Sequence, residues 1–196
     1  KLEFLMPEIT TSGTVFNKSK LIGQKTLIPI SGGKDSAVVA NLLKDKIPTV
    51  AFILNPQKNL SSMRVYNRTR IANKIEIKRE IDSKLIELNK LGFLNGHTPI
   101  MTYLSFLSVF CAALSDCQDV AFGNERSANE GGTKYLGKII NHQYDKSFEF
   151  EKKFREYNQK YLSAVNYFSF LRPLYEIQIA KLFSKLSIAT NLSIFL

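Results

Sequence analysis

The sequence has little of what would mark a disulfide scaffold or a metalloprotein. It contains two cysteines, Cys111 and Cys117, six positions apart in an apolar stretch, a spacing typical of neither a metal site nor a redox pair. A chain of 196 residues buries about 70% of the surface that its unfolded form exposes, so its core needs neither a disulfide nor a metal. We therefore expect both thiols to be buried in a reducing cytosol.

Targeting and membrane signals are also absent from the sequence. No charged-then-apolar leader is visible, and there is no internal repeat or low-complexity tract. The most hydrophobic run, residues 99–115, includes Thr102, Tyr103, Ser105 and Ser108 and is short for a bilayer span. We expect a cytoplasmic protein without a membrane partner, in which this run forms a core helix.

Acidic residues are scarce relative to basic ones. The 27 Lys plus Arg exceed the 17 Asp plus Glu, giving a net charge of +10. Such an excess predicts an anionic partner: nucleic acid, a membrane surface or a small phosphorylated ligand. Scattered lysines in a chain rich in Ile, Asn and Lys equally fit simple residue usage. One cluster, Arg64, Arg68, Arg70 and Lys74, is either a diphosphate or RNA contact or a solvated helix face.

Short apolar runs alternate with helical patterns, which predicts an α/β fold with a parallel sheet and helices on both faces. The expected strands are 26–30, 48–54, 74–78 and 119–122. The expected helices are 36–45, 60–71, 82–90 and one that Thr98 and Pro99 open. Residues 124–147 are polar and irregular, a pattern typical of functional or disordered segments.

The last third of the chain predicts a helical appendage. Phe150, Phe154, Tyr157, Tyr161 and Val165 recur at the spacing of one helix face, which favours core packing over base stacking. A second helix is expected from Pro173. The predicted organisation is a lead-in (1–25), a nucleotide-binding core (26–125) and a segment of substrate-binding loops and C-terminal helices packed on the core (126–196).

The most informative segment is the glycine-containing loop between the first predicted strand and helix. It consists of Ser31, Gly32, Gly33, Lys34, Asp35 and Ser36. Adjacent glycines let backbone N–H groups approach a phosphate, and the following helix directs the positive end of its dipole at the same anion. The serine hydroxyls can donate to the phosphates, and Asp35 is placed to hold Mg²⁺ on them.

This loop has neither the spacing of the common P-loop nor that of the dinucleotide-binding fingerprint. It resembles the SGGxDS signature of the PP-loop ATP pyrophosphatases, which include NAD synthetase, GMP synthetase and tRNA-modifying enzymes. The resemblance implies a Rossmann-like fold, the cofactors ATP and Mg²⁺, and cleavage of ATP to AMP and pyrophosphate.

Four further motifs carry a closer resemblance. They are GHTP (96–99), GNERSANE (123–130), NHQYDKSFEFE (141–151) and FSFLRPLYE (168–176). Together with SGGKDS they look like the bacterial UDP-N-acetylmuramoyl-L-alanyl-L-glutamate epimerases, over roughly residues 27–186. The resemblance implies inversion of the terminal L-Glu of a UDP-linked muramoyl peptide. A proton α to a carboxylate is very weakly acidic, and an acyl adenylate removes the opposing charge and exposes that proton to a general base.

By position in these motifs we expect three catalytic residues, Asp35, Glu125 and His142. Glu125 is expected to contact a second metal or the nucleotide ribose, and His142 either transfers a proton or orients the substrate. The expected substrate-binding residues are His97, Asn124, Asn129, Glu130, Asn141, Lys146, Arg172 and Glu176. His97 can instead buttress a helix start, and Lys146 and Arg172 can instead be surface charges or ion-pair partners.

Two alternatives stay open at this point. One is a PP-loop enzyme that modifies tRNA, which the net charge favours, although Cys111 and Cys117 make a poor thiolation pair. The other is a nucleotide-binding module without turnover.

Overall fold

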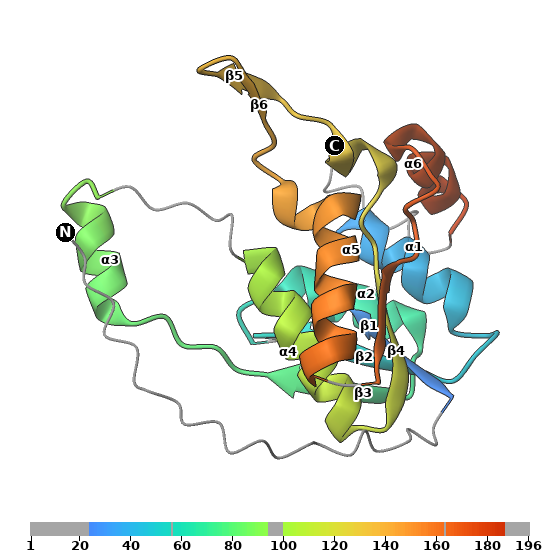
Figure 1. The fold of residues 1–196 in the computed structure, drawn as a ribbon. Helices are drawn as coiled ribbons and strands as arrows, with labels where there is room; N and C mark the ends of the chain where they lie inside the picture. The colour runs from blue at the N-terminus through green and yellow to red at the C-terminus, as the bar shows by residue number, and fades with distance from the viewer. Residues whose placement is uncertain (1–23, 56, 94–99, 163, 187–196) are drawn as a thin grey trace.

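In the computed structural model, which describes residues 24–55, 57–93, 100–162 and 164–186, one parallel sheet forms the centre of the molecule (Figure 1). Its five strands lie in the order β3-β2-β1-β4-β7, and each neighbouring pair is parallel. The strands are β1 (Lys25–Pro29), β2 (Thr49–Leu54), β3 (Asn73–Ile77), β4 (Cys117–Phe122) and β7 (Asn166–Ser169).

The central strands are apolar on both sides because each face of the sheet is covered. In β1, Leu27 joins one hydrophobic cluster and Ile28 joins the other. In β4, Val120 faces the cluster of Leu27 and Ala121 faces the cluster of Ile28. This alternation explains why the two strands read as continuous hydrophobic runs.

Helices form a layer on each face of this sheet. Val38 of α1 (Lys34–Leu43), Val65 of α2 (Leu60–Thr69) and Ile179 of α6 (Glu176–Ser184) share the cluster of Ile28. Val109 of α4 (Ile100–Leu114) and Phe154 of α5 (Phe148–Tyr157) share the cluster of Leu27. The predicted α/β architecture is therefore confirmed.

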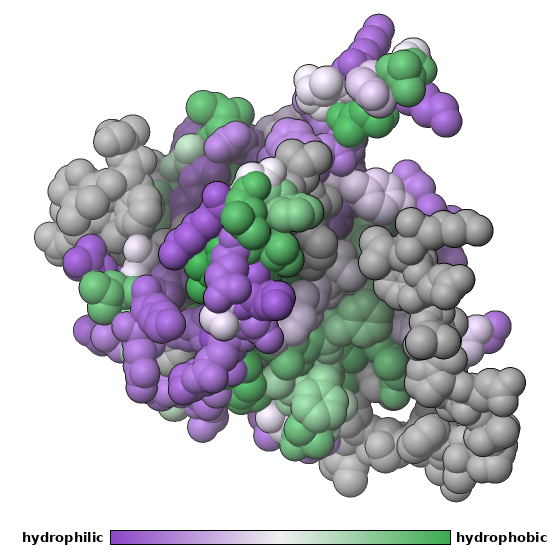
Figure 2. All heavy atoms as spheres, turned by 90° about the vertical axis from the view of Figure 1, so that its left-hand side faces the viewer, coloured by the Kyte–Doolittle hydropathy of each residue, from purple (hydrophilic) through white to green (hydrophobic). Residues whose placement is uncertain are grey.

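Two elements extend away from the layered body (Figure 1). Helix α3 (Ser83–Lys90) has no buried residue. A hairpin of β5 (Thr133–Tyr135) and β6 (Lys138–Ile140) projects beyond the sheet, with every residue of both strands exposed. Figure 2 shows this hairpin as an arm that mixes hydrophobic and hydrophilic side chains. Two 3₁₀ turns flank it, η1 (Arg126–Asn129) and η2 (Tyr144–Lys146).

The C-terminal third departs from the sequence prediction. Strand β7 was not predicted, and Val165, expected on a helix face, lies just before it. Helix α5 continues as a π-helix over Asn158–Leu162 and ends there. The aromatic stripe is also split, because Phe154 is buried whereas Tyr157 and Tyr161 are exposed. The reason is tertiary: pairing with β4 turns a short segment into a strand that its own sequence does not specify.

Smaller corrections concern element boundaries and the irregular segment. Helix α1 begins at Lys34 instead of residue 36, and the helix expected from Pro173 begins at Glu176. Cys117 starts β4, so it does not share a helix with Cys111. Residues 124–147, expected to be irregular, contain the β5–β6 hairpin.

The outer face of α4 is apolar and exposed. Tyr103, Phe106 and Phe110 line a groove of about 430 Å³ together with Leu162. Figure 2 shows hydrophobic side chains gathered between hydrophilic ones on the side of the molecule that α3 and α4 face. Among the described residues, no helix has the length and apolar character needed to cross a bilayer.

Candidate functional site

The loop after β1 and the loop after β4 leave the same edge of the sheet. The chain runs from β1 to β2 on one side, and β4 lies on the other side of β1, so the strand order reverses between β1 and β4. Open α/β sheets bind ligands at such a switch point, outside the carboxyl ends of the strands. A cavity of about 260 Å³ lies here. Its polar lining residues are Ser31, Asp35, Ser36, Asn124, Glu125, Gln143 and Lys146.

Gly32 fixes the path of the loop after β1. Its φ is +89°, and an added Cβ would lie 2.6 Å from the backbone nitrogen of Ser62 in α2. Glycine is therefore required here by conformation and by the close passage of α2. Gly33 is different, since an added Cβ would meet only Ser31 Oγ at 3.9 Å. Gly33 is thus the glycine that leaves open space in the loop.

The first turn of α1 has no side-chain cap at Gly33 within the described residues, so its first backbone N–H groups stay available to a ligand. The Ser36 hydroxyl donates to Gly33 O at 3.0 Å and accepts from Ser31 N at 3.3 Å. Ser36 therefore holds the loop together, and its hydroxyl oxygen also accepts from the hydroxyl of the exposed Ser31 at 3.4 Å.

The loop after β4 comes very close to α1. An added Cβ on Gly123 would lie 3.2 Å from both the carbonyl carbon and Cβ of Asp35. The small residue at position 123 thus lets the Asp35 backbone approach the end of β4. As a result Asp35 and Glu125 line the same cavity.

Charged groups of both signs surround this cavity. Lys34 Nζ lies 3.0 Å from Asp35 Oδ1 and 3.1 Å from Glu176 Oε1. Burial alone would lower the pKa of Lys34, but the bonds to Asp35 and Glu176 outweigh it and raise this pKa. The pKa of Glu125 is raised, mainly by burial and then by the carboxylates of Glu176 and Asp35, while Lys34 and Lys146 oppose the shift. The buried Oε2 of Glu125 has no hydrogen-bond donor among the described residues.

The residues present fit a magnesium ion that arrives with phosphates. Among the described parts of the chain, no three histidine, cysteine, aspartate or glutamate side chains gather as a metal cage. Mg²⁺ is usually bound by one or two carboxylates together with substrate phosphates, so a cage is not needed. Asp35 suits this role because its carboxylate lies in the first turn of α1, beside the available N–H groups.

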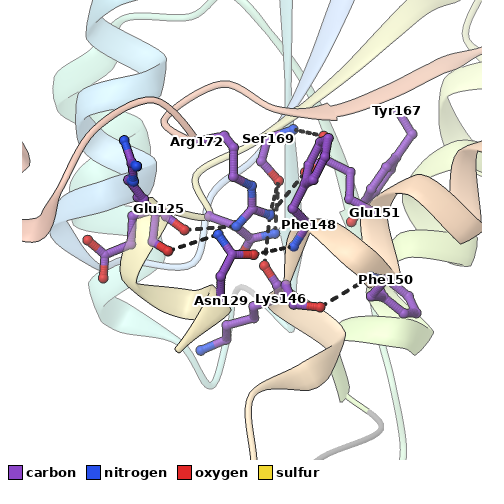
Figure 3. A network of polar contacts seen from close by, with 12 residues as sticks. Glu125, Asn129, Lys146, Phe148, Phe150, Glu151, Tyr167, Ser169 and Arg172 are labelled. Atoms are coloured by element: carbon purple, nitrogen blue, oxygen red, sulfur yellow. Dashed lines mark hydrogen bonds and ion pairs between the residues drawn. The ribbon is translucent and has the colours of Figure 1, made fainter. Parts of the chain in front are cut away.

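Arg172 ties the loop after β4 to the turn η2 (Figure 3). Its Nη1 donates to the Glu125 carbonyl oxygen, and its Nη2 donates to the Lys146 carbonyl oxygen, both at 2.8 Å. Nη2 also lies 3.0 Å from Glu151 Oε2, and Glu151 is only 4% exposed. Ser169 N, at the end of β7, donates to Glu151 Oε1. The Arg172 guanidinium, predicted to bind substrate, is thus bonded to groups of the protein itself. It fixes the backbone of two residues that line the switch-point cavity, Glu125 and Lys146.

Several predicted substrate ligands also hold the fold. Asn124 donates to Ser169 Oγ at 3.1 Å. Asn129 donates to Arg126 O and accepts from Phe148 N, at the start of α5. Asn141 donates to Ala128 O at 2.9 Å, which joins η1 to the chain before η2. Of these three asparagines, only Asn124 lines the switch-point cavity.

A second, larger cavity of about 880 Å³ lies on the other side of η1 and η2. Its polar lining residues include Arg126, Asn129, Asn141, Tyr144, Lys152 and Arg172. Neighbouring residues of the same turns face the first cavity, including Ala128 of η1 and Lys146 of η2. The two turns therefore form a wall between the cavities.

The remaining predicted residues lie away from the switch point. His142 is exposed and contacts Gln143 Nε2 at 3.5 Å, and Glu130 is exposed at the end of η1. Neither His142 nor Glu130 lines either cavity. His97 lies outside the described residues, as do Thr98 and Pro99.

The basic cluster on and after α2 does not reach the switch point either. Lys74 pairs with Glu76 and lies over the Tyr66 ring, and Arg70 ends α2 in a left-handed conformation. The lining of both cavities comes from other residues of the described chain. The location of this cluster therefore favours a solvated helix face.

Sequence reasoning missed three residues that shape the site. Asp145 is buried, and its Oδ2 accepts from Met101 N in the first turn of α4, so η2 caps that helix. Gln143 lines the switch-point cavity, and Glu151 neutralises Arg172. All three lie in the NHQYDKSFEFE motif, which was the available signal, but their partners are distant in sequence.

Comparison with known proteins places this arrangement in a family. The model of the MurL N-terminal domain matches residues 4–170. The chain belongs to the MurL N-terminal domain family. This membership confirms the resemblance found from the sequence motifs.

Curated relatives of this MurL-type chain are named as epimerases. It is 36% identical over 162 residues to the UDP-N-acetyl-alpha-D-muramoyl-L-alanyl-L-glutamate epimerase of Xanthomonas oryzae pv. oryzae, covering 81% of this chain and 35% of that protein. It is 32% identical over 166 residues to the protein of the same name from Salinispora tropica, covering 84% of this chain and 36% of the relative. The chain thus spans about a third of the length of these relatives.

The solved structures support the fold. The U34-tRNA thiolase NcsA from Methanococcus maripaludis aligns over 85% of this chain and 63% of its own, with a TM-score of 0.58 and 17% identity. At that identity the likeness shows the fold alone. It agrees with the predicted parallel sheet with helices on both faces.

Proposed function

We propose that this chain uses ATP and Mg²⁺ to invert the terminal L-Glu of UDP-N-acetylmuramoyl-L-alanyl-L-glutamate, releasing AMP and pyrophosphate. The observation that carries the proposal is the shared cavity at the switch point. There the uncapped first turn of α1 and the carboxylate of Asp35 lie beside Glu125 and Lys146. A phosphate-binding element and proton-transfer groups are thus in reach of one bound substrate.

We assign ATP and the glutamate substrate that it activates to two neighbouring cavities. A cavity of about 340 Å³ opens at the ends of β1 and β2 and shares Pro29 and Ser31 with the switch-point cavity. We assign the nucleoside to this cavity, the phosphates to the first turn of α1, and Mg²⁺ to Asp35. The glutamate carboxylate then lies toward Glu125, where activation by ATP makes its α-proton accessible to a base.

The chemistry of the two cysteines argues against the tRNA-thiolating alternative. Cys111 and Cys117 are both buried, and burial raises the pKa of each thiol. A thiol needs a lowered pKa and access to act as a nucleophile or sulfur carrier. Neither cysteine lines the switch-point cavity or the cavity at the ends of β1 and β2.

The test is a product analysis. The chain is incubated with ATP, Mg²⁺ and UDP-N-acetylmuramoyl-L-alanyl-L-glutamate, and nucleotides, pyrophosphate and glutamate chirality are measured. We expect AMP, pyrophosphate and D-Glu, with formation of all three reduced at least about 100-fold in Asp35→Ala. Asp45→Ala, which changes an exposed aspartate beyond α1, is the matched control and should behave like the unaltered chain. Release of ADP instead of AMP would overturn the proposal.

A further inference from the structure

We propose that Glu125 and Lys146 are the two proton-transfer groups of the inversion, one for each face of the glutamate α-carbon; the inference rests on the proposed function. Inversion at carbon through two groups needs a base on one side and an acid on the other. Both groups must be present in opposite protonation states when the substrate binds.

The two side chains meet this requirement by chemical type. Glu125 supplies a carboxylate and Lys146 an ammonium group, and both line the switch-point cavity. They come from different segments, the loop after β4 and the turn η2, and we place the glutamate α-carbon between them. No ion pair joins Glu125 to Lys146 in the described part of the chain, so neither charge is neutralised by the other.

Glu125 also has the surroundings of a base. Its Oε2 is buried and without a hydrogen-bond donor among the described residues, which leaves that oxygen free for a proton from the substrate. Burial and the nearby Glu176 and Asp35 raise its pKa, which makes the carboxylate a stronger base.

The backbone geometry holds the two residues at a set separation. One guanidinium, that of Arg172, binds the carbonyl oxygens of both Glu125 and Lys146 at 2.8 Å (Figure 3). Glu151 anchors this guanidinium and itself accepts from the backbone of β7. The exposed His142 has no comparable support and lines neither cavity.

The cavity size fits this assignment. About 260 Å³ is below the range of roughly 300–1,000 Å³ that accommodates a whole drug-sized ligand. It suits the terminal glutamate, with the bulky UDP-sugar outside.

The Glu125 carboxylate takes the α-proton, so the Cα–H bond breaks, an O–H bond forms, and the electron pair moves into the activated carbonyl as an enolate. The Lys146 ammonium then gives a proton to the opposite face of Cα. Proton exchange with water restores the carboxylate and the ammonium before the next turnover.

The experiment follows solvent deuterium in D₂O, with ATP and Mg²⁺ present, starting separately from the L-Glu substrate and from its D-Glu epimer. Pyrophosphate release is measured in the same samples. From the L-Glu substrate, Glu125→Gln should lose deuterium incorporation at least about 100-fold while pyrophosphate release continues. Lys146→Gln should still incorporate deuterium into L-Glu but yield no D-Glu, and from the D-Glu epimer the roles of the two variants should reverse.

Matched controls are Glu156→Gln on α5 and Lys134→Gln on β5, both exposed and outside the two cavities. Equal losses on both epimers, or losses of pyrophosphate release in step with exchange, would show a structural role and overturn the inference while the proposed function stands. An unaltered chain that neither releases pyrophosphate nor forms D-Glu would overturn the proposed function and this inference with it.

Discussion

The switch-point edge of the sheet and the β5–β6 hairpin each contain a glycine with positive φ, but they constrain it differently. At Gly32 an added Cβ would lie 2.6 Å from the backbone of α2, whereas at Gly137 it would meet nothing within 4 Å. The conformation at the sheet edge is set by packing against distant segments, and the conformation in the hairpin is set by its own turn. Residues at the edge therefore have fixed positions, while hairpin residues depend on local structure.

Breaking the Arg172–Glu151 pair should have the largest effect on the sheet edge. Arg172→Met leaves Glu151 as a buried carboxylate without its cation, and loss of one partner of a buried pair costs about 3–5 kcal/mol of unfolding free energy. Urea denaturation measures the change. Lys153→Met, which removes an exposed partner of Glu149, is the matched control and should change the free energy little. Equal effects of the two substitutions would contradict the difference between edge and surface.

The paired glycine substitutions test the comparison directly. Gly137→Ala should cost only the left-handed conformational penalty of about 1–2 kcal/mol, confined to the hairpin. Gly32→Ala adds a clash with the α2 backbone, so it should lower the global unfolding free energy by more and reduce pyrophosphate release. Gly33→Ala, which has open space and a φ of −86°, is the control for the stability measurement alone, because it removes a glycine of the same loop without a clash. Similar denaturation midpoints for Gly32→Ala and Gly137→Ala would refute the comparison.

The partly buried side chain of Glu125 gives a smaller effect that depends on pH. Its pKa is higher in the folded than in the unfolded chain, mainly because of burial. Between the unfolded and the folded pKa, the folded state therefore binds more protons than the unfolded state does. The free energy of unfolding then falls as the pH rises through this window, so ionised Glu125 lowers stability above it. Glu125→Gln should therefore be more stable than the unaltered chain at pH 7, with the difference disappearing below the unfolded pKa. Denaturation midpoints across this range measure it, and a difference of the opposite sign would contradict the pKa direction.

The smallest effect is expected at His142, on the hairpin side of the wall. Its ring is exposed and lies 3.5 Å from Gln143 Nε2, so His142→Gln should change the unfolding free energy by no more than about 0.5 kcal/mol and D-Glu formation by no more than about twofold. Turnover and chirality assays measure this. A loss of 100-fold would instead restore His142 as a proton-transfer group in place of the Glu125–Lys146 pair.

The fold was predictable where the sequence pattern is local. The strands around Leu27, Ala51 and Val120 are apolar on both faces, and the glycine loop follows β1 as expected. Strand β7 was not predictable, because its four residues become a strand only by pairing with β4. The β5–β6 hairpin was missed because its strands are short and exposed, without the alternation of a half-buried sheet.

The motifs predicted which residues belong to the site, but not which of them line the cavity and which hold its wall. Motif position brought Asp35 and Glu125 into one proposed site, and the structure places both at one cavity. It could not separate residues that line the cavity, such as Lys146, from those that hold the wall, such as Arg172 and Asn141. That distinction depends on hydrogen bonds between residues far apart in sequence, which no local spacing encodes.

The guanidinium of Arg172 also has a role in the chain's connectivity. It binds the carbonyl oxygens of Glu125 and Lys146, the residues at the two ends of the segment that contains the β5–β6 hairpin. Arg172 comes from outside this segment and holds its two ends together. It thus acts as a non-covalent cross-link that closes the hairpin segment into a loop.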